Sequence, residues 1–249
     1  MIIMLQLDIY SCVLPSQYLY HIFWKLIDFV YIMVQLNNKM MALAAPHEVS
    51  NRHEFETALK NKAIKEILIV KDFHCLYSYE INNPVTIDGN NLDLNGCSIT
   101  ILSDDVTIKN MNIIATAQGI YVGRSNQNAP KNILIENCVL CGRWEGKTHP
   151  RSQNIPEPFD IGINMFENTK VTVKDTTIKK CAMGMIVHDN AVCTLQNVDF
   201  EKNHTDRDRC ATGMMYGATS EPTGIFVDAN TTSDANTTSK YKQFVNEEF

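Results

Sequence analysis

The chain of 249 residues is 45% hydrophobic and 20% charged, an ordinary globular composition that is sufficient to bury a core. Its formal net charge of −6, without clusters of Lys and Arg, argues against a nucleic-acid-binding surface, because phosphate contacts need gathered cations. Among the eight cysteines only Cys138 and Cys141 have CxxC spacing, so no zinc site is predicted.

The first segment, residues 1–45, is an apolar N-terminal extension, in which residues 18–36 are long enough for a membrane helix. Lys25 and Asp28 would each cost about 2.5 to 3.5 kcal/mol near the bilayer centre. A signal peptide fits less well, because Asp28 interrupts the apolar stretch and no basic residue precedes Lys25. A membrane helix, a signal peptide, an extra capping helix and a nonessential upstream segment all stay open.

A short amphipathic helix is predicted near residues 51–62. Asn51, followed three residues later by Glu54, has the spacing of a capping box at a helix start. Phe55 and Leu59 lie one turn apart and, with Ala58, give this helix one apolar face. The helix is therefore expected to cover another element of the fold.

A strand pattern then recurs through the chain. Each copy has an apolar residue, Thr or Leu, a second apolar residue, a polar residue, and finally Gly, Asn or Asp. The copies are Val85–Gly89, Val106–Asn110, Ile133–Asn137, Val171–Asp175 and Cys193–Asn197. The last residue of each indicates a tight corner, because Gly, Asn and Asp tolerate left-handed backbone angles.

A second strand alternates with the first. Its copies are Gly119–Val122, Gly162–Met165, Gly184–Val187 and Gly224–Val227. Gly162 and Gly184 are 22 residues apart, as are Val171 and Cys193, so both strands share one period, which is typical of a solenoid. The sequence therefore predicts an all-β fold, a right-handed parallel β-helix of about five to six coils over residues 46–228, with the amphipathic helix as its lid. A doubly wound sheet would need long helices between the strands.

The end of the chain, residues 229–249, is predicted to be a low-complexity tail, because Asp228–Ser233 is duplicated as Asp234–Ser239. Asp206–Arg209 is interpreted as a self-neutralising surface turn. Most cysteines fall within the repeats, where reduced thiols act as small hydrophobes. Reduced thiols favour an intracellular or virion location, while membrane attachment through residues 18–36 stays open.

The coil pattern resembles the repeats of the pectin-lyase-like superfamily, which includes polysaccharide lyases, pectin hydrolases, phage tailspikes and adhesins. The resemblance covers about two thirds of the chain and implies the fold more strongly than any function. Pectin hydrolases of this superfamily carry Asn-Thr-Asp, Asp-Asp, Gly-His-Gly and Arg-Ile-Lys motifs. Only the Asp pair has a counterpart here, Asp104-Asp105, so the hydrolase machinery is not supported.

Two regions are candidate ligand-binding sites. The outward residues of the second strand, predicted to form one apolar stripe, include Tyr121 and Phe226, which suit stacking on a sugar or a partner protein. The insertion Cys141–Phe159 carries further candidates, namely Arg143, Trp144, His149 and Arg151. Solenoid proteins often bind ligands through such inserted loops. An ordinary charged loop, and a stripe covered by another segment, are the alternatives.

The corner after the second strand is the candidate catalytic or metal site. The register predicts one column there, formed by Arg124, Glu167, His188, Asp189 and Asp228. Stacked carboxylates raise one another's pKa or bind a cation, so Glu167, Asp189 and Asp228 are candidate calcium ligands, while Arg124, Glu167, His188 and Asp189 are candidate catalytic residues. Solvated turns are the alternative, and no other cofactor is predicted.

These features favour a noncatalytic β-helix that binds a glycan or a protein partner, as adhesins and phage surface proteins do. Whether the chain is an enzyme stays open, with a polysaccharide lyase or glycoside hydrolase as the alternative. A structural fibre or assembly protein is the third hypothesis. A product assay on any bound polymer separates the first two, because a binding protein leaves its ligand intact.

A shortened chain tests the role of the N-terminal extension, because translation from Met40 or Met41 would omit most of it. A protein beginning at Met41 should unfold cooperatively and give strong β-type circular dichroism, because the helix near residue 51 already supplies the lid. Loss of folding in that protein would show that residues 1–40 are integral.

Overall fold

The computed structural model describes residues 24–33, 45–75, 78–114, 118–124, 129–146, 160–210, 224–229 and 232–233. The chain divides into two compact units, residues 1–45 and 46–249. In the first unit, residues 24–33 form a helix whose side chains are all exposed. Within the described ranges, no helix is both long and apolar enough to cross a membrane.

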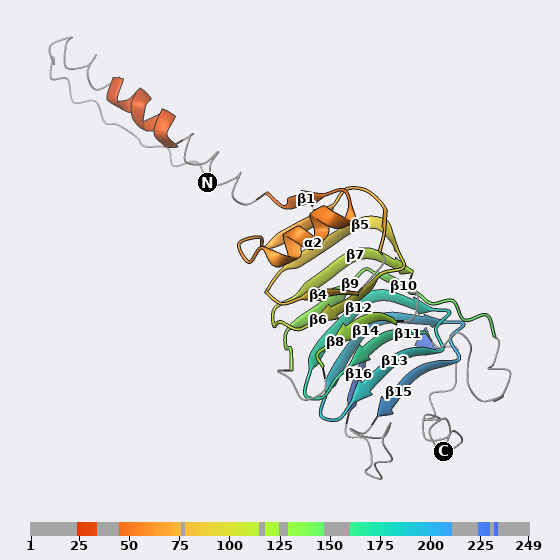
Figure 1. Ribbon diagram of the computed structural model, residues 1–249. Coiled ribbons are helices and arrows are strands. Elements are labelled where there is room, and N and C mark those ends of the chain that lie inside the picture. Colours follow the sequence, from red (N-terminus) through yellow and green to blue (C-terminus); the bar gives the residue numbers. More distant parts are fainter. Residues whose placement is uncertain are drawn as a thin grey trace. The chain divides into compact units, whose positions relative to one another are not determined.

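The second unit is a parallel β-helix, as predicted, and its strands stack in two sheets (Figure 1). The described strands of the first sheet are β1 (His47–Val49), β2 (Glu66–Ile69), β3 (Phe73–His74), β5 (Thr86–Asn95), β7 (Thr107–Ile114), β9 (Ile133–Glu136), β10 (Val139–Cys141), β12 (Lys170–Lys179), β14 (Val192–Glu201), β16 (Ile225–Ala229) and β17 (Thr232–Ser233). Those of the second sheet are β4 (Ser78–Ile81), β6 (Ser98–Ile101), β8 (Gln118–Val122), β11 (Ile161–Met165), β13 (Met183–His188) and β15 (Thr205–Cys210).

Side chains alternate between the core and the outer surface along the strands, because successive residues of a strand point to opposite faces. Val85 and Ile87 are buried, whereas Thr86 between them is partly exposed. The register stacks the outward residues of successive coils in one column, which is Thr86, Thr107, Leu134, Thr172 and Thr194. The buried residues that follow them stack in the same register and form a continuous apolar row inside the rod, namely Ile87, Ile108, Ile135, Val173 and Leu195.

Left-handed residues turn the chain at the corner within the first sheet. Asn110, Asn137, Asp175 and Asn197 have φ of 52°, 50°, 47° and 54°. Their side chains also link the coils. Asn137 Nδ2 donates to Asn110 Oδ1 at 2.8 Å, Asn110 Nδ2 donates to Asp88 Oδ1 at 3.0 Å, and Asn197 Nδ2 donates to Asp175 Oδ1 at 2.7 Å. The corner residues inferred from the repeat therefore also stabilise the stack.

The coil that begins with β5 departs from this pattern at Gly89. The left-handed residues there are Asn90 and Asn91, with φ of 52° and 58°, and the register on the next coil shifts at this corner. Gly89 is needed for another reason: a Cβ on it would lie 2.6 Å from the Asn110 carbonyl oxygen. Close approach of two backbones, rather than a positive φ, requires glycine at this position.

The helix α2 (Arg52–Lys60) covers the N-terminal end of the stack beside β1 and β4 (Figure 1). The Asn51 side chain accepts from the Glu54 backbone N at 3.1 Å, and Glu54 accepts from the Ser50 backbone N at 2.7 Å, which lowers the pKa of Glu54. Phe55, Ala58 and Leu59 are buried. The predicted cap and its apolar face are therefore confirmed.

Two assignments at the C-terminal end were wrong. Asp206–Arg209 is not a surface turn but part of β15, which stacks on β13, with Arg207 opposite Met185. Gly224–Val227 does not belong to the second sheet, because β16 pairs with β14 in the first sheet. Strand structure also continues through Ala229 and at Thr232–Ser233, within the predicted tail.

Asn137 tests the left-handed corner. Asn137→Val should lower the free energy of unfolding by about 1 to 2 kcal/mol, because a β-branched residue is strained at φ 50°. Asn137→Gly, which keeps the backbone angle but loses the hydrogen bond to Asn110, should cost less. Urea denaturation measures both, and a Val variant as stable as the Gly variant would contradict this explanation.

Candidate functional site

The corner between the second and the first sheet is built from stacked turns. The turn after β11 is closed by Thr169, whose Oγ1 donates to the Phe166 carbonyl oxygen at 2.7 Å. It is joined to the turn after β13, because the Asn168 N–H donates to the Asp189 carbonyl oxygen at 3.1 Å. Residues at equal positions of these turns therefore lie one coil apart, at a spacing of about 4.8 Å.

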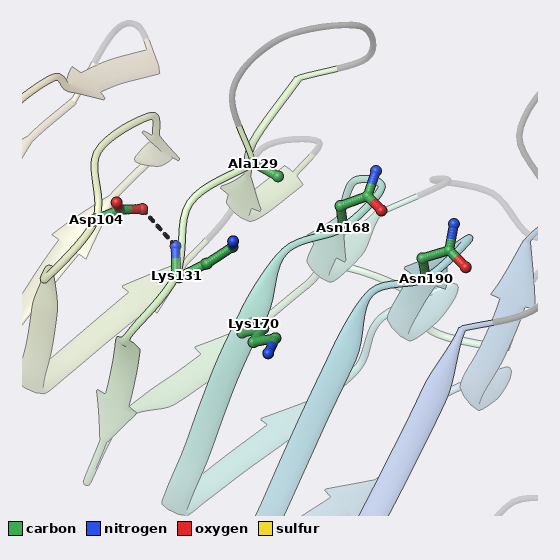
Figure 2. Close-up of a pocket in the computed structure, with 6 residues that line it drawn as sticks. All are labelled: Asp104, Ala129, Lys131, Asn168, Lys170 and Asn190. Carbon is green, nitrogen blue, oxygen red and sulfur yellow. Dashed lines mark hydrogen bonds between the residues drawn. The ribbon is translucent and has the colours of Figure 1, made fainter.

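An open groove of about 490 Å³ runs along this corner. Its lining comes from four successive coils and comprises Asp104, Ala129, Lys131, Asn168, Lys170 and Asn190 (Figure 2). Asp104 Oδ1 accepts from the Lys131 backbone N at 2.7 Å, which fixes one end of the groove. The other polar side chains of the lining are two ammonium groups and two amides.

The two amides of the groove are arranged alike. Asn168 and Asn190 are exposed, have φ of 61° and 56°, and their side chains point the same way from neighbouring turns (Figure 2). An amide both donates and accepts hydrogen bonds, and the ammonium groups of Lys131 and Lys170 donate. The groove therefore presents two amides at equivalent positions and two ammonium groups, which suit a ligand rich in hydroxyls or carbonyls.

A row of rings runs from Tyr121 of β8 through Phe166, in the turn after β11, to His188 at the end of β13. The rings of Tyr121 and Phe166 are stacked with centroids 6.1 Å apart, and those of Phe166 and His188 are stacked and nearly parallel, with centroids 5.2 Å apart. His188 Nε2 lies 3.1 Å from Asn164 Oδ1. The three rings are partly exposed, so they form a row of rings at the surface.

Burial sets the ionisation of this row. Desolvation lowers the pKa of His188, and the nearby carboxylates of Glu167 and Asp189 only partly oppose the effect. Desolvation likewise raises the pKa of Tyr121. Both rings are therefore neutral at pH 7, and His188 interacts with Asn164 as a neutral imidazole.

The predicted corner column is only partly correct. Glu167, His188 and Asp189 do share this corner, but the Arg124 guanidinium pairs with Glu80. Asp228 lies in β16 instead, opposite Leu195, and accepts from Arg207 at 2.6 Å. Across the described residues, no three His, Cys, Asp or Glu side chains are gathered as metal ligands would be.

The predicted outward stripe is also only partly correct. Tyr121, Asn164 and Ile186 stack as expected, but Asp208 of β15 follows them, not Phe226. Phe226 lies in the first sheet, where the Arg207 guanidinium is 5.5 Å from its ring centroid. Asn164 and Ile186 are only 9% and 2% exposed, so a ligand could reach only the Tyr121 end of the stripe.

The start of the long insertion is part of the rod. Arg143 donates from its backbone N to Asp160 Oδ2 at 2.7 Å, and its guanidinium pairs with the same carboxylate, which is fully buried. Trp144 donates from its backbone N to the Lys180 carbonyl oxygen at 2.8 Å, and its ring lies 5.4 Å from that of His204. Arg143 therefore joins the start of the insertion to Asp160, the residue before β11. The candidates His149 and Arg151 lie outside the described residues.

The outer face of the first sheet is less suited to a ligand. Its charges alternate in sign from coil to coil in the order Asp88, Lys109, Glu136 and Lys174. Lys109 lies 3.3 Å from Asp88, and Lys174 lies 2.5 Å from Glu136. Because these charges satisfy one another, the groove at the corner is the stronger candidate site.

The sequence interpretation missed the groove residues. Asn168 and Asn190 are 22 residues apart, which is the period of the coil, and each directly follows a residue that was placed in the corner column. Extending the column by one position would have found them. Lys131 and Lys170 carry no such signal, because the loop before β9 breaks the spacing.

Comparisons with known proteins agree with this fold. A family model described as a right-handed β-helix region matches residues 74–246. No curated protein is similar enough to this chain to count as a match.

His188 makes stability depend on pH. Because its pKa is lowered in the folded protein, the unfolded chain binds a proton more readily, and stability should fall as the pH falls below about 6.5. His188→Gln should reduce this loss, whereas His74→Gln, at an exposed position on β3, should not. Thermal melting between pH 7.5 and 5.5 measures the effect; equal pH dependence in the wild type and His188→Gln would contradict it.

Proposed function

The chain belongs to the right-handed β-helix family, and we propose that it is a noncatalytic module that binds an extended glycan along the groove at the corner. The observation that carries this proposal is the row of amide and ammonium groups along the groove. They come from successive coils of one stack, so the backbone sets the spacing of the residues that carry them.

A glycan suits this groove better than other ligands. Hydroxyl groups pair with amides, which donate and accept, and with the ammonium groups of Lys131 and Lys170. Phe166 lies in the turn that also carries Asn168, and its ring, stacked on that of His188, offers an apolar surface of the kind on which a sugar face packs. The repeat of the coils fits a ligand that itself repeats along its length.

Binding without turnover is favoured by the kind of side chains that line the groove. General acid–base chemistry needs an acid and a base that reach the same bond. Among the described residues of the lining, the one carboxylate is that of Asp104, which is hydrogen-bonded to the backbone of Lys131. A lyase or hydrolase remains the second hypothesis, because His188 lies close to Glu167 and Asp189 at the same corner.

A glycan array with the full chain, followed by a product assay on each retained polymer, tests both hypotheses. We expect retention of at least one polymer without shorter or unsaturated products. Product formation that His188→Gln abolishes would favour the enzyme instead. Absence of any bound glycan, with capture of a defined protein through the same groove, would replace the glycan by a protein ligand.

Variants of the groove locate the site. Asn168→Gly and Asn190→Gly remove the amides but keep the left-handed backbone, and together with Lys170→Ala they should weaken binding about tenfold or more, since lost hydrogen bonds to a bound ligand each cost about 1 kcal/mol. Lys179→Ala, at the other end of β12, is the matched control and should bind normally. Equal affinity of all variants, measured by calorimetry, would exclude the groove.

A further inference from the structure

Two cysteines lie at the same corner of consecutive coils beneath the N-terminal lid. Before this corner Phe73 pairs with Leu94, and after it Ser78 pairs with Ser98. Cys75 and Cys97 lie between these fixed pairs, and the Cys75 N–H donates to the Asn95 carbonyl oxygen at 2.8 Å. Neighbouring coils are about 4.8 Å apart, which is compatible with the Cα separation of a disulfide, usually about 4.4 to 6.8 Å.

Both side chains point into the same part of the core. Cys75 is 4% and Cys97 0% exposed. The surrounding cluster includes Phe55 of the lid, whose ring lies 5.7 Å from Phe73 and 5.1 Å from Tyr79. Both thiols are therefore shielded from solvent beneath the lid.

The two thiols interact directly, and their ionisation is unequal. A hydrogen bond from Cys97 lowers the pKa of Cys75, whereas the pKa of Cys97 is raised well above its ordinary value. Thiolate therefore forms first on Cys75, which is the arrangement in which one thiol attacks and the other resolves.

Other described cysteines differ from this pair. Burial raises the pKa of Cys138 and Cys181 to about 12, and their Sγ atoms donate to backbone carbonyl oxygens. Burial also raises the pKa of Cys193. These three thiols lie in the core as small apolar groups, consistent with their predicted role.

We propose that Cys75 and Cys97, free in this structure, form a reversible disulfide that joins the first coil to the second beneath the lid. The oxidant is a low-molecular-weight disulfide such as oxidised glutathione. The Cys75 thiolate attacks one of its sulfurs, forming a mixed disulfide and releasing one thiolate. Cys97, losing its proton to that thiolate, then attacks the Cys75 sulfur and releases the second thiolate, which takes up the proton that Cys75 gave to solvent on ionising. Two protein thiols are oxidised and one small disulfide is reduced to two thiols.

The bond would strengthen the end of the rod where unfolding can begin. It closes a loop between residues 75 and 97 and so restricts the unfolded chain. Access for the oxidant requires local opening of the lid, which is a short helix at the end of the stack. The modification is thus expected during folding or on transient opening.

Refolding tests the proposal, because the oxidant can reach both thiols before the core closes. The full chain is refolded from urea with reduced and oxidised glutathione and then mapped by mass spectrometry under nonreducing conditions. We expect a Cys75–Cys97 cross-linked peptide and a melting temperature about 5 °C or more above that of the reduced protein, reversed by dithiothreitol. A refolded protein in which both thiols are free, or in which either is joined to another cysteine, would overturn the proposal.

Matched variants separate the bond from general effects of oxidation. Cys97→Ala should remove the difference in melting temperature between oxidised and reduced protein. Cys138→Ala, which removes a thiol equally buried in the core, should keep that difference. If Cys97→Ala fails to fold, Cys75→Ala replaces it in the same comparison. A difference that survives in both Cys75→Ala and Cys97→Ala would also overturn the proposal.

Discussion

The parallel hydrogen-bonded stacking of one coil on the next is the constraint on which the rest of this structure depends. Each coil must place its strands in register with those before and after it, at about 4.8 Å per step. Any residue at a given position therefore becomes part of a column, whether apolar inside or polar outside. The core, the asparagine corner and the candidate site are all such columns.

The same constraint makes the ends of the stack costly, because a terminal coil has unpaired backbone and uncovered core. At the N-terminal end, α2 buries Phe55, Ala58 and Leu59 against the first coils. At the other end Arg207 takes an inward position of β15, with its guanidinium over the rings of Phe200 and Phe226 and bound to Asp228. A cation paired in this way covers apolar rings while its charge is satisfied by the carboxylate.

Function is expected where the columns are polar and accessible. The outer face of the first sheet pairs its own charges, and the centre of the second is buried at Asn164 and Ile186. The corner between the sheets instead keeps amides and ammonium groups exposed beside a row of rings. Because the backbone sets their spacing, a ligand bound there meets a preformed site, which is the basis of the proposed glycan binding.

The sequence by itself determined the parts of the structure that depend on local pattern. Alternating side chains, left-handed corner residues such as Asn137 and the cap at Asn51 predicted the coil and its lid, because each reflects the preferences of a few neighbouring residues. The period also determined that Glu167, His188 and Asp189 share a corner. The same period also marks β15, which was wrongly assigned as a turn, because Asp206 near the start of this strand lies 22 residues after Gly184.

Only the tertiary structure decided how the last coil and the loops are placed. Charged residues occupy inward positions of β15 because, among the described strands of the second sheet, none covers it, so the apolar pattern fails there. Gly224–Val227 resembles the second strand, yet it pairs with β14, because its four residues fit either sheet and the pairing depends on the position of the segment in the fold. Likewise Arg143 pairs with Asp160, and Lys131 and Asn168 line one groove, although insertions of irregular length separate the two residues of each pair in the sequence. The repeat cannot predict such neighbours, because the insertions interrupt its period.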